Sequence, residues 1–316
     1  MGPGLRPKNI GAVLLVLALA LPGCSSNKTT TVRSLSPKEA AQLQQSPPEK
    51  VKEEEKDPVK LEADGDRLAL SEQWPAALFQ YNRALALADE ENQHRIRSKI
   101  GRVYMKNGRW AQAEATFLVL TRNKADDPVA WQGLGLARLA HGQRQGVEAP
   151  LKKALEINPD LWLAHNGLGI FYNWRGELQQ AVLAFGRALA LKPDSPSIRN
   201  NLGLTFIMIG RLSLAEAAFK RALEINPTYK LAANNLALVY ARQGRRGEAL
   251  ALFKKSVGQA QAHNNLGCLL SWQGRHLEAA KEFEKALQIM PTYYERADRN
   301  LATIKNQSLV KPLDQD

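Results

Sequence analysis

The sequence predicts an all-α protein built as a solenoid of repeated helix-turn-helix units. Residues 201–227 (NLGLTFIMIGRLSLAEAAFKRALEINP) carry small and large apolar residues at helical spacing and end in Asn-Pro. This spacing returns about every 34 residues, a period typical of helical repeat arrays. Composition agrees, since 44% of the residues are hydrophobic but only 7% are aromatic, and alanine and leucine favour helices. No stretch alternates like a β-strand, so we expect stacked helix pairs.

The N-terminus carries the pattern of an export signal. Arg6 and Lys8 precede a 12-residue apolar run at residues 10–21. As a helix, this run is too short to cross a hydrocarbon core of about 30 Å. We therefore predict that residues 1–23 are a signal peptide.

The end of this segment resembles the lipobox of bacterial lipoproteins. It has Leu21, Gly23 and Cys24 in the expected order, with Pro22 where Ala or Ser is commoner. The resemblance implies cleavage before Cys24 and acylation of that cysteine with diacylglycerol and a further chain such as palmitate. Ser25 in place of Asp implies sorting to the outer membrane, facing the periplasm, with the outer leaflet of the inner membrane as the alternative. A plain secretory signal with an incidental cysteine is the other interpretation.

Residues 24–57 are predicted to be the lipidated cysteine and a disordered tether. From Ser25 to Asp57 there are six basic and six acidic residues, few large apolar residues and no period. A flexible coil of this length spans roughly 30 Å. If Cys24 is lipidated, Cys268 has no disulfide partner, and we assign it no role.

Seven copies of the repeat follow, each with glycine, alanine, aromatic or proline landmarks at matching positions. The first is degenerate, and the sixth lacks its last turn. Terminal copies are expected to be atypical because they cap the array. Residues 294–316 are predicted to be a capping helix and a polar tail. The predicted copies are 58–91, 94–127, 128–161, 162–195, 196–229, 230–259 and 260–293.

The landmarks identify the chain as resembling the tetratricopeptide repeat (TPR) family. In residues 196–229 they are Leu202, Gly203, Phe206, Gly210, Ala215, Phe219, Ala222 and Pro227. The resemblance implies a superhelical solenoid of about seven helix pairs. It also implies that positions 2, 5, 6, 9, 12 and 13 of the first helix in each copy face a concave, partner-binding surface.

The sequence gives no support for an enzyme, a metal site or a cofactor. It contains no HExxH, no CxxC, no P-loop and no Gly-x-Ser-x-Gly. No two histidines have metal-ligand spacing. His165 and His263 stand at position 4 of their copies, where the family usually has Trp, so we expect them to pack between helices. The histidines are His94, His141, His165, His263 and His276.

Asparagine recurs at two neighbouring positions of the predicted concave wall. Asparagine is a poor residue for a helix interior, so its repetition needs a reason. An amide offers a donor and an acceptor, which suits the backbone of an extended peptide. We predict a peptide-binding ladder similar to those of peptide-binding TPR solenoids; the alternative is that these amides bond between helices. The residues are Asn166, Asn200, Asn234 and Asn264 at position 5, and Asn201, Asn235 and Asn265 at position 6.

Positive charge gathers on the second copy. The formal net charge is +12, and Arg95, Lys99, Arg102 and Lys106 occupy positions 2, 6, 9 and 13, one face of a helix. This resembles the basic clamps with which some TPR domains grip carboxylates, so an acidic partner is predicted. A solvated basic face is the alternative. Nucleic acid is not expected, because export would separate the chain from it.

Trp174 and Trp272 stand at position 13 of their copies, at the edge of the predicted groove. Exposed aromatic residues can anchor an apolar side chain of a partner. Packing against a neighbouring helix is the alternative.

The combination of lipobox and repeats resembles lipoproteins of bacterial envelope assembly. The Tad pilus-assembly lipoproteins and the pilotins of type IV pilus secretins are examples. The resemblance implies a membrane-anchored scaffold, without catalysis, that holds extended or acidic protein segments, including pilus or secretin subunits. The alternative function is a periplasmic adaptor that docks cell-wall hydrolases or a protease.

Overall fold

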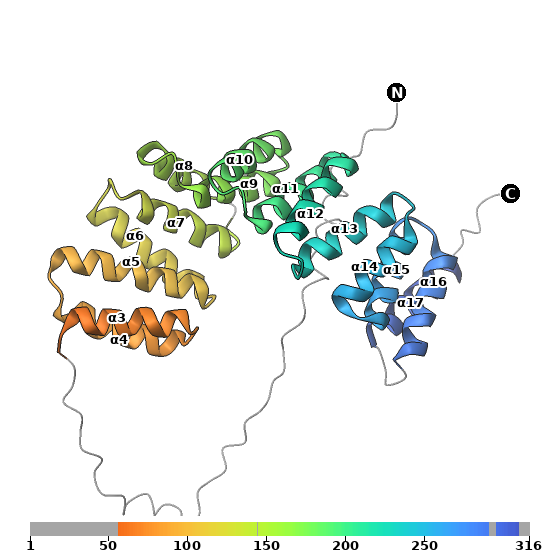
Figure 1. The fold of residues 1–316 in the computed structure, drawn as a ribbon, viewed down its shortest axis with the longest axis horizontal. Coiled ribbons are helices and arrows are strands. Elements are labelled where there is room, and N and C mark those ends of the chain that lie inside the picture. Colours follow the sequence, from red (N-terminus) through yellow and green to blue (C-terminus); the bar gives the residue numbers. More distant parts are fainter. Residues whose placement is uncertain (1–55, 144, 291–294, 310–316) are drawn as a thin grey trace, which may run out of the picture. The chain divides into compact units, whose positions relative to one another are not determined.

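The computed structural model describes residues 56–143, 145–290 and 295–309 (Figure 1). These residues form fifteen α-helices and no strand, which confirms the predicted all-α repeat fold. Helix labels follow Figure 1 and begin at α3. The predicted signal peptide, Cys24 and most of the predicted tether lie outside the described residues.

The helices follow one another as pairs, each with a first helix (A) and a second helix (B). One further A helix, α17 (Glu295–Leu309), follows the last pair. The pairs are α3 (Pro58–Leu70) and α4 (Trp74–Leu87), α5 (Glu90–Lys106) and α6 (Trp110–Asn123), α7 (Pro128–Ala140) and α8 (Glu148–Ile157), α9 (Trp162–Arg175) and α10 (Leu178–Leu191), α11 (Pro196–Ile209) and α12 (Leu212–Ile225), α13 (Lys230–Arg242) and α14 (Arg246–Val257), and α15 (Gln259–Trp272) and α16 (His276–Ile289).

The helix starts follow from local sequence. Asp57 and Asp127 each precede a proline, and their carboxylates accept from the backbone N–H of Val59 and Val129 at 2.9 and 2.8 Å. Such N-caps satisfy a backbone donor that the helix leaves open, and proline has no N–H to lose in the first turn. At the other end, Gly210 closes α11 with φ +84°, a left-handed conformation that glycine adopts without strain.

The chain divides into two compact units within α5, after Val103. In the N-terminal unit, α3 and α4 form a hairpin, and the Tyr81 hydroxyl donates to Asp66 at 2.7 Å. The part of α5 in this unit buries Ile96, Ile100 and Val103. These apolar residues lie on one side of the helix.

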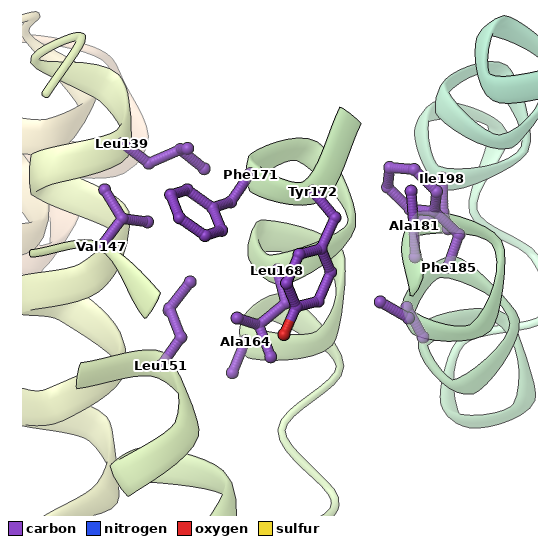
Figure 2. Close-up of a cluster of buried hydrophobic side chains, with 12 residues drawn as sticks. Leu139, Val147, Leu151, Ala164, Leu168, Phe171, Tyr172, Ala181, Phe185 and Ile198 are labelled. Atoms are coloured by element: carbon purple, nitrogen blue, oxygen red, sulfur yellow. The ribbon is translucent and has the colours of Figure 1, made fainter. Parts of the chain in front are cut away.

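The C-terminal unit is a stack in which each B helix contacts the next A helix and consecutive A helices from α7 to α17 also contact each other. Apolar side chains fill the space between pairs. Figure 2 shows Phe171 of α9 pointing toward Leu139 and Val147, while Phe185 lies on the other side of α9. The core therefore continues from pair to pair.

Within five of the pairs, one close contact joins A to B. A large side chain of the B helix lies over a glycine of the A helix, so that a Cβ on Gly203 would come within 2.6 Å of the Phe219 ring. Phe219 is fully buried there. The same contact joins Gly65 to Tyr81, Gly135 to Leu151, Gly169 to Phe185 and Gly267 to Phe283.

The sixth pair departs from the pattern. Its B helix, α14, ends at Val257, and Gly258 alone connects it to α15, with φ +87° and ψ 168°. Its A helix has Ala237, fully buried, where the neighbouring A helices have glycine. The loop that precedes an A helix elsewhere is therefore missing between α14 and α15.

The last A helix, α17, completes the stack. It buries Ala297, Leu301 and Ile304 and contacts both α16 and α15. None of the helices within the described ranges is long and apolar enough to cross a membrane.

The close A–B contact gives a first prediction. Replacing Gly203 with Val should lower the free energy of unfolding by about 1–3 kcal/mol, because the added carbons overlap the Phe219 ring. Urea unfolding followed by helical circular dichroism measures the change.

Gly186 is the matched control, because a Cβ there meets no atom within 4 Å. Gly186→Ala should stabilise the chain by about 0.5–1 kcal/mol, since helical glycine costs backbone entropy. Equal effects of the two substitutions would contradict the close contact as the source of stability.

Candidate functional site

The asparagines of successive A helices bond to one another. Position-6 amides donate to position-5 amides of the preceding copy: Asn201 Nδ2 to Asn166 Oδ1 at 3.3 Å, and Asn235 Nδ2 to Asn200 Oδ1 at 2.8 Å. In α17, Asn300 occupies the equivalent place and donates to Asn264 at 3.0 Å. The amides therefore form hydrogen bonds between helices, which was the alternative to the peptide-binding ladder.

Burial divides the seven predicted asparagines into two groups. The amides of Asn200, Asn234, Asn235 and Asn264 are buried between helices, at most 9% exposed. The other three asparagines are half-buried: Asn166, Asn201 and Asn265. Direct contact with a peptide stays a prediction, and it fits these three side chains best.

Asn265 differs from its counterparts because of the shortened sixth pair. Its expected acceptor, Asn234 Oδ1, accepts instead from Ser256 Oγ at 2.5 Å. Ser256 stands at a position where α8, α10, α12 and α16 have alanine. Within the described ranges, the Asn265 amide has no side-chain hydrogen bond, so both its donor and its acceptor are open.

Exposed apolar side chains flank these amides. Trp174 and Trp272 are 42% and 48% exposed at the C-terminal ends of α9 and α15. The Arg242 guanidinium lies over the Trp272 ring at 4.7 Å, and its burial lowers the pKa of Arg242. Leu163 and Leu231, at position 2 of α9 and α13, are exposed as well. We call the exposed and half-buried side chains at positions 2, 5, 6, 9 and 13 of the A helices from α7 to α15 the A-helix face.

Binding of an acidic partner by the predicted basic clamp on α5 stays a prediction, and two of its four cations form ion pairs within the chain. Arg95 binds Glu62 at 2.7 Å, and Lys99 binds Glu62 and Asp66 of α3 at 2.7 and 2.6 Å. Burial raises the pKa of Asp66, but the Lys99 ammonium and the Tyr81 hydroxyl outweigh it, so the pKa lies below its ordinary value. These two cations therefore neutralise the chain's own carboxylates.

Arg102 and Lys106 are exposed on the same helix. The repeat alignment holds a signal of this pairing, because Glu62 and Lys99 occupy positions 5 and 6, where Asn166 and Asn201 bond, but the contact between those positions is visible only in the structure. The excess charge of the second copy alone did not reveal it.

His165 and His263 are buried, as expected. The His165 ring lies 2.9 Å from the Pro159 carbonyl through Nε2, and His263 Nδ1 lies 2.7 Å from Glu282 Oε2. Burial raises the pKa of the Cys268 thiol to about 11, which keeps it protonated. No group of histidine, cysteine and acidic side chains in the described part of the chain could hold a metal ion.

Family models described as tetratricopeptide repeat match residues 98–161, 174–230, 231–257 and 260–293, more than half of the chain. The chain belongs to the tetratricopeptide repeat family. Such repeats generally form protein-interaction scaffolds without catalytic activity, which agrees with the predicted class of function. A search of curated proteins gives no match.

Solved TPR structures share this fold. PilW, a widely conserved type IV pilus biogenesis factor, has 23% identity and a TM-score of 0.56, with 68% of this chain and 100% of PilW covered. PilF of Pseudomonas aeruginosa has 16% identity and a TM-score of 0.54, covering 69% and 98%. A TPR protein of Parabacteroides merdae has 17% identity and a TM-score of 0.56, covering 79% and 99%.

A second set of polar contacts joins neighbouring TPRs through the B helices. A half-buried glutamate of one B helix binds side chains of the following A helix and its turn. Glu216 of α12 is the most connected: it binds Lys220, Gln243 and Arg245 at 2.7–3.1 Å. Hydrogen bonding to Lys220 lowers the pKa of Glu216 most, and Gln243 and Arg245 add to this, giving about 2. Glu114 and Glu148 make equivalent contacts with Arg138 and Arg175.

The lowered pKa predicts acid sensitivity. Because Glu216 titrates at about 2 when folded and near 4.5 when unfolded, its contribution is complete above about pH 5 and is lost as the pH falls toward 2. Glu216→Gln should therefore lower the melting temperature at pH 7, and the difference from the unsubstituted protein should vanish near pH 2. Thermal melts at a series of pH values measure it.

Glu224→Gln is the control, since this exposed carboxylate pairs only with Arg221 of its own helix among the contacts of the described residues. Exposed pairs of this kind contribute about 0–1 kcal/mol. A pH-independent difference for Glu216→Gln would contradict the role of its charge.

Proposed function

We propose that this TPR protein is a scaffold whose A-helix face holds extended segments of other proteins. The carrying observation is that Asn166, Asn201 and Asn265 keep part of each amide open while Trp174 and Trp272 stand exposed on the same face. The amides would pair with the alternating N–H and C=O groups of an extended backbone. The tryptophans would receive apolar side chains.

The hydrogen bonds within the stack support this arrangement. Asn201 uses Nδ2 to reach Asn166, which fixes the orientation of its amide and leaves Oδ1 free to accept. A fixed side chain loses less conformational entropy when a partner binds. The buried asparagines would thus position the face, and the half-buried ones would contact the partner.

We further propose that the partners are components of a pilus or secretion apparatus. The likeness to PilW is one of fold, and it makes pilins and secretins the first partners to test. The alternative is an adaptor that docks cell-wall hydrolases or a protease. The identity of the captured protein distinguishes the two.

We also propose that Cys24 is lipidated and holds the scaffold at the periplasmic side of the outer membrane. The support is the sequence Leu21 to Cys24, with Ser25 after it. Two or more acyl chains anchor stably where one does not. In that compartment nucleic acid is not a partner.

Photo-crosslinking tests the interaction face. A crosslinking amino acid in place of Trp174 on the A-helix face should capture pilus or secretin subunits in cells, whereas the same group in place of Gln179, exposed on the B helix α10, should not. Capture of hydrolases or a protease at Trp174 would support the adaptor instead. Equal capture at both positions would remove the A-helix face as the site.

Alanine substitution tests the amides. Replacing Asn166, Asn201 and Asn265 together should weaken binding of the captured segment by about 10- to 1,000-fold, because three lost hydrogen bonds contribute about 0.5–1.5 kcal/mol each. Titration calorimetry measures this, and circular dichroism confirms the fold. Unchanged affinity in a folded variant would refute the role of the amides.

Metabolic labelling tests the anchor. Labelled palmitate should appear on the protein and be lost from Cys24→Ala, which should also leave the membrane fraction. Cys268→Ala is the control and should keep the label. Label that persists in Cys24→Ala would refute the lipobox.

A further inference from the structure

In three successive TPRs, one side chain closes the gap between an A helix and the loop before it. Position 4 donates to a carbonyl at position 32 of the preceding copy: Trp131 Nε1 to Ala125 O at 2.8 Å, His165 Nε2 to Pro159 O at 2.9 Å and Arg199 Nη2 to Pro193 O at 2.9 Å. A carbonyl only accepts, so the His165 nitrogen carries the proton. Three different side chains thus make the same contact at this place in the repeat.

The next copy lacks that side chain. Position 4 of α13 is Ala233, and the equivalent carbonyl belongs to Pro227. No donor from the described residues reaches this carbonyl. Pro227 is exposed, so its carbonyl is open to a donor from another molecule.

A cavity of about 510 Å³ occupies this region. Leu223, Leu252 and Ala233 supply apolar lining, and Pro227 and Tyr229 bring the loop into it. A cleft of about 470 Å³ lies between α8, α9 and α10, but there the His165 ring is in place, and the loop residues do not line it. The volume of the cavity beside Ala233 is within the range of ligand sites in proteins.

The rim of the cavity is basic. Lys230 and Lys255 line it and make no ion pair with any residue that the structure describes. The other charges are engaged: Lys220 with Glu216 and Glu224 with Arg221. Burial raises the pKa of the Tyr229 phenol, which keeps its proton available for donation to an anion.

We propose that this cavity is a second docking site, which receives a tryptophan side chain from an acidic segment of a partner protein. The indole ring would take the place that Trp131 takes in its own copy, with its N–H donating to the Pro227 carbonyl. Carboxylates beside the tryptophan would pair with Lys230 and Lys255. The site uses residues of α12, α13 and α14 that do not belong to the A-helix face, so the scaffold can hold two segments at once.

A peptide of defined sequence tests the site. The probe is a capped hexapeptide with one tryptophan between two pairs of aspartates, labelled for fluorescence anisotropy, and the protein is the full chain in detergent. Ala233→Trp should fill the cavity and weaken binding at least about tenfold while leaving helicity and melting temperature intact. Ala233→His, which copies His165, provides the same test with a smaller side chain.

Matched variants separate the contribution of the two lysines from that of the peptide tryptophan. Replacing Lys230 and Lys255 with Ser should weaken the aspartate peptide about tenfold at low salt and leave an asparagine version unchanged. Replacing the peptide tryptophan with alanine should abolish binding. Asn201→Ala should bind the probe like the unsubstituted protein, which keeps this result independent of the proposed A-helix function.

Three outcomes would overturn the proposal. These are equal binding of the tryptophan and alanine peptides, unchanged binding by both Ala233 variants, and a dimer in sedimentation that Ala233→Trp abolishes. The last would mean that a second copy of this chain, through its own exposed tryptophans, is the occupant.

Discussion

The contact of a B-helix side chain with an A-helix glycine is the constraint on which the stack depends. With no Cβ on Gly203, the Phe219 ring lies directly against the helix backbone, and the two helices approach closely. Gly65, Gly135, Gly169 and Gly267 repeat it. A helix pair of this size cannot bury its apolar faces alone, so the same geometry, repeated, gives each pair a matching surface for the next.

Polar contacts then set how the pairs join, and they use side chains that resemble binding residues. Asn235 and Asn200 bond to each other between helices, and Lys99 meets Glu62 at the same two positions in the first TPRs. Buried polar groups require such partners. An asparagine or lysine of a repeat is therefore open to a partner protein only where the neighbouring buried group has another hydrogen-bond partner within the chain.

The shortened sixth TPR leaves hydrogen-bonding groups open in more than one place. With only Gly258 between α14 and α15, Ser256 takes the Asn234 acceptor and leaves the Asn265 amide open, while His263 bonds to Glu282 in the absence of a loop before it. Beside it, Ala233 leaves the Pro227 carbonyl exposed in a cavity. The open amide of Asn265 and the open carbonyl of Pro227 thus both arise at departures from the regular repeat.

The sequence by itself determined the fold. The recurrence of Gly203, Phe219 and their counterparts is a local pattern, and helix periodicity and the repeat period are both visible in one dimension. Only the tertiary structure decided which of the predicted side chains are open. The pairing of Lys99 with Glu62 and the burial of Asn200 arise between helices more than thirty residues apart, and composition does not encode such contacts. Which polar side chains pair with each other depends on their distances in the folded chain.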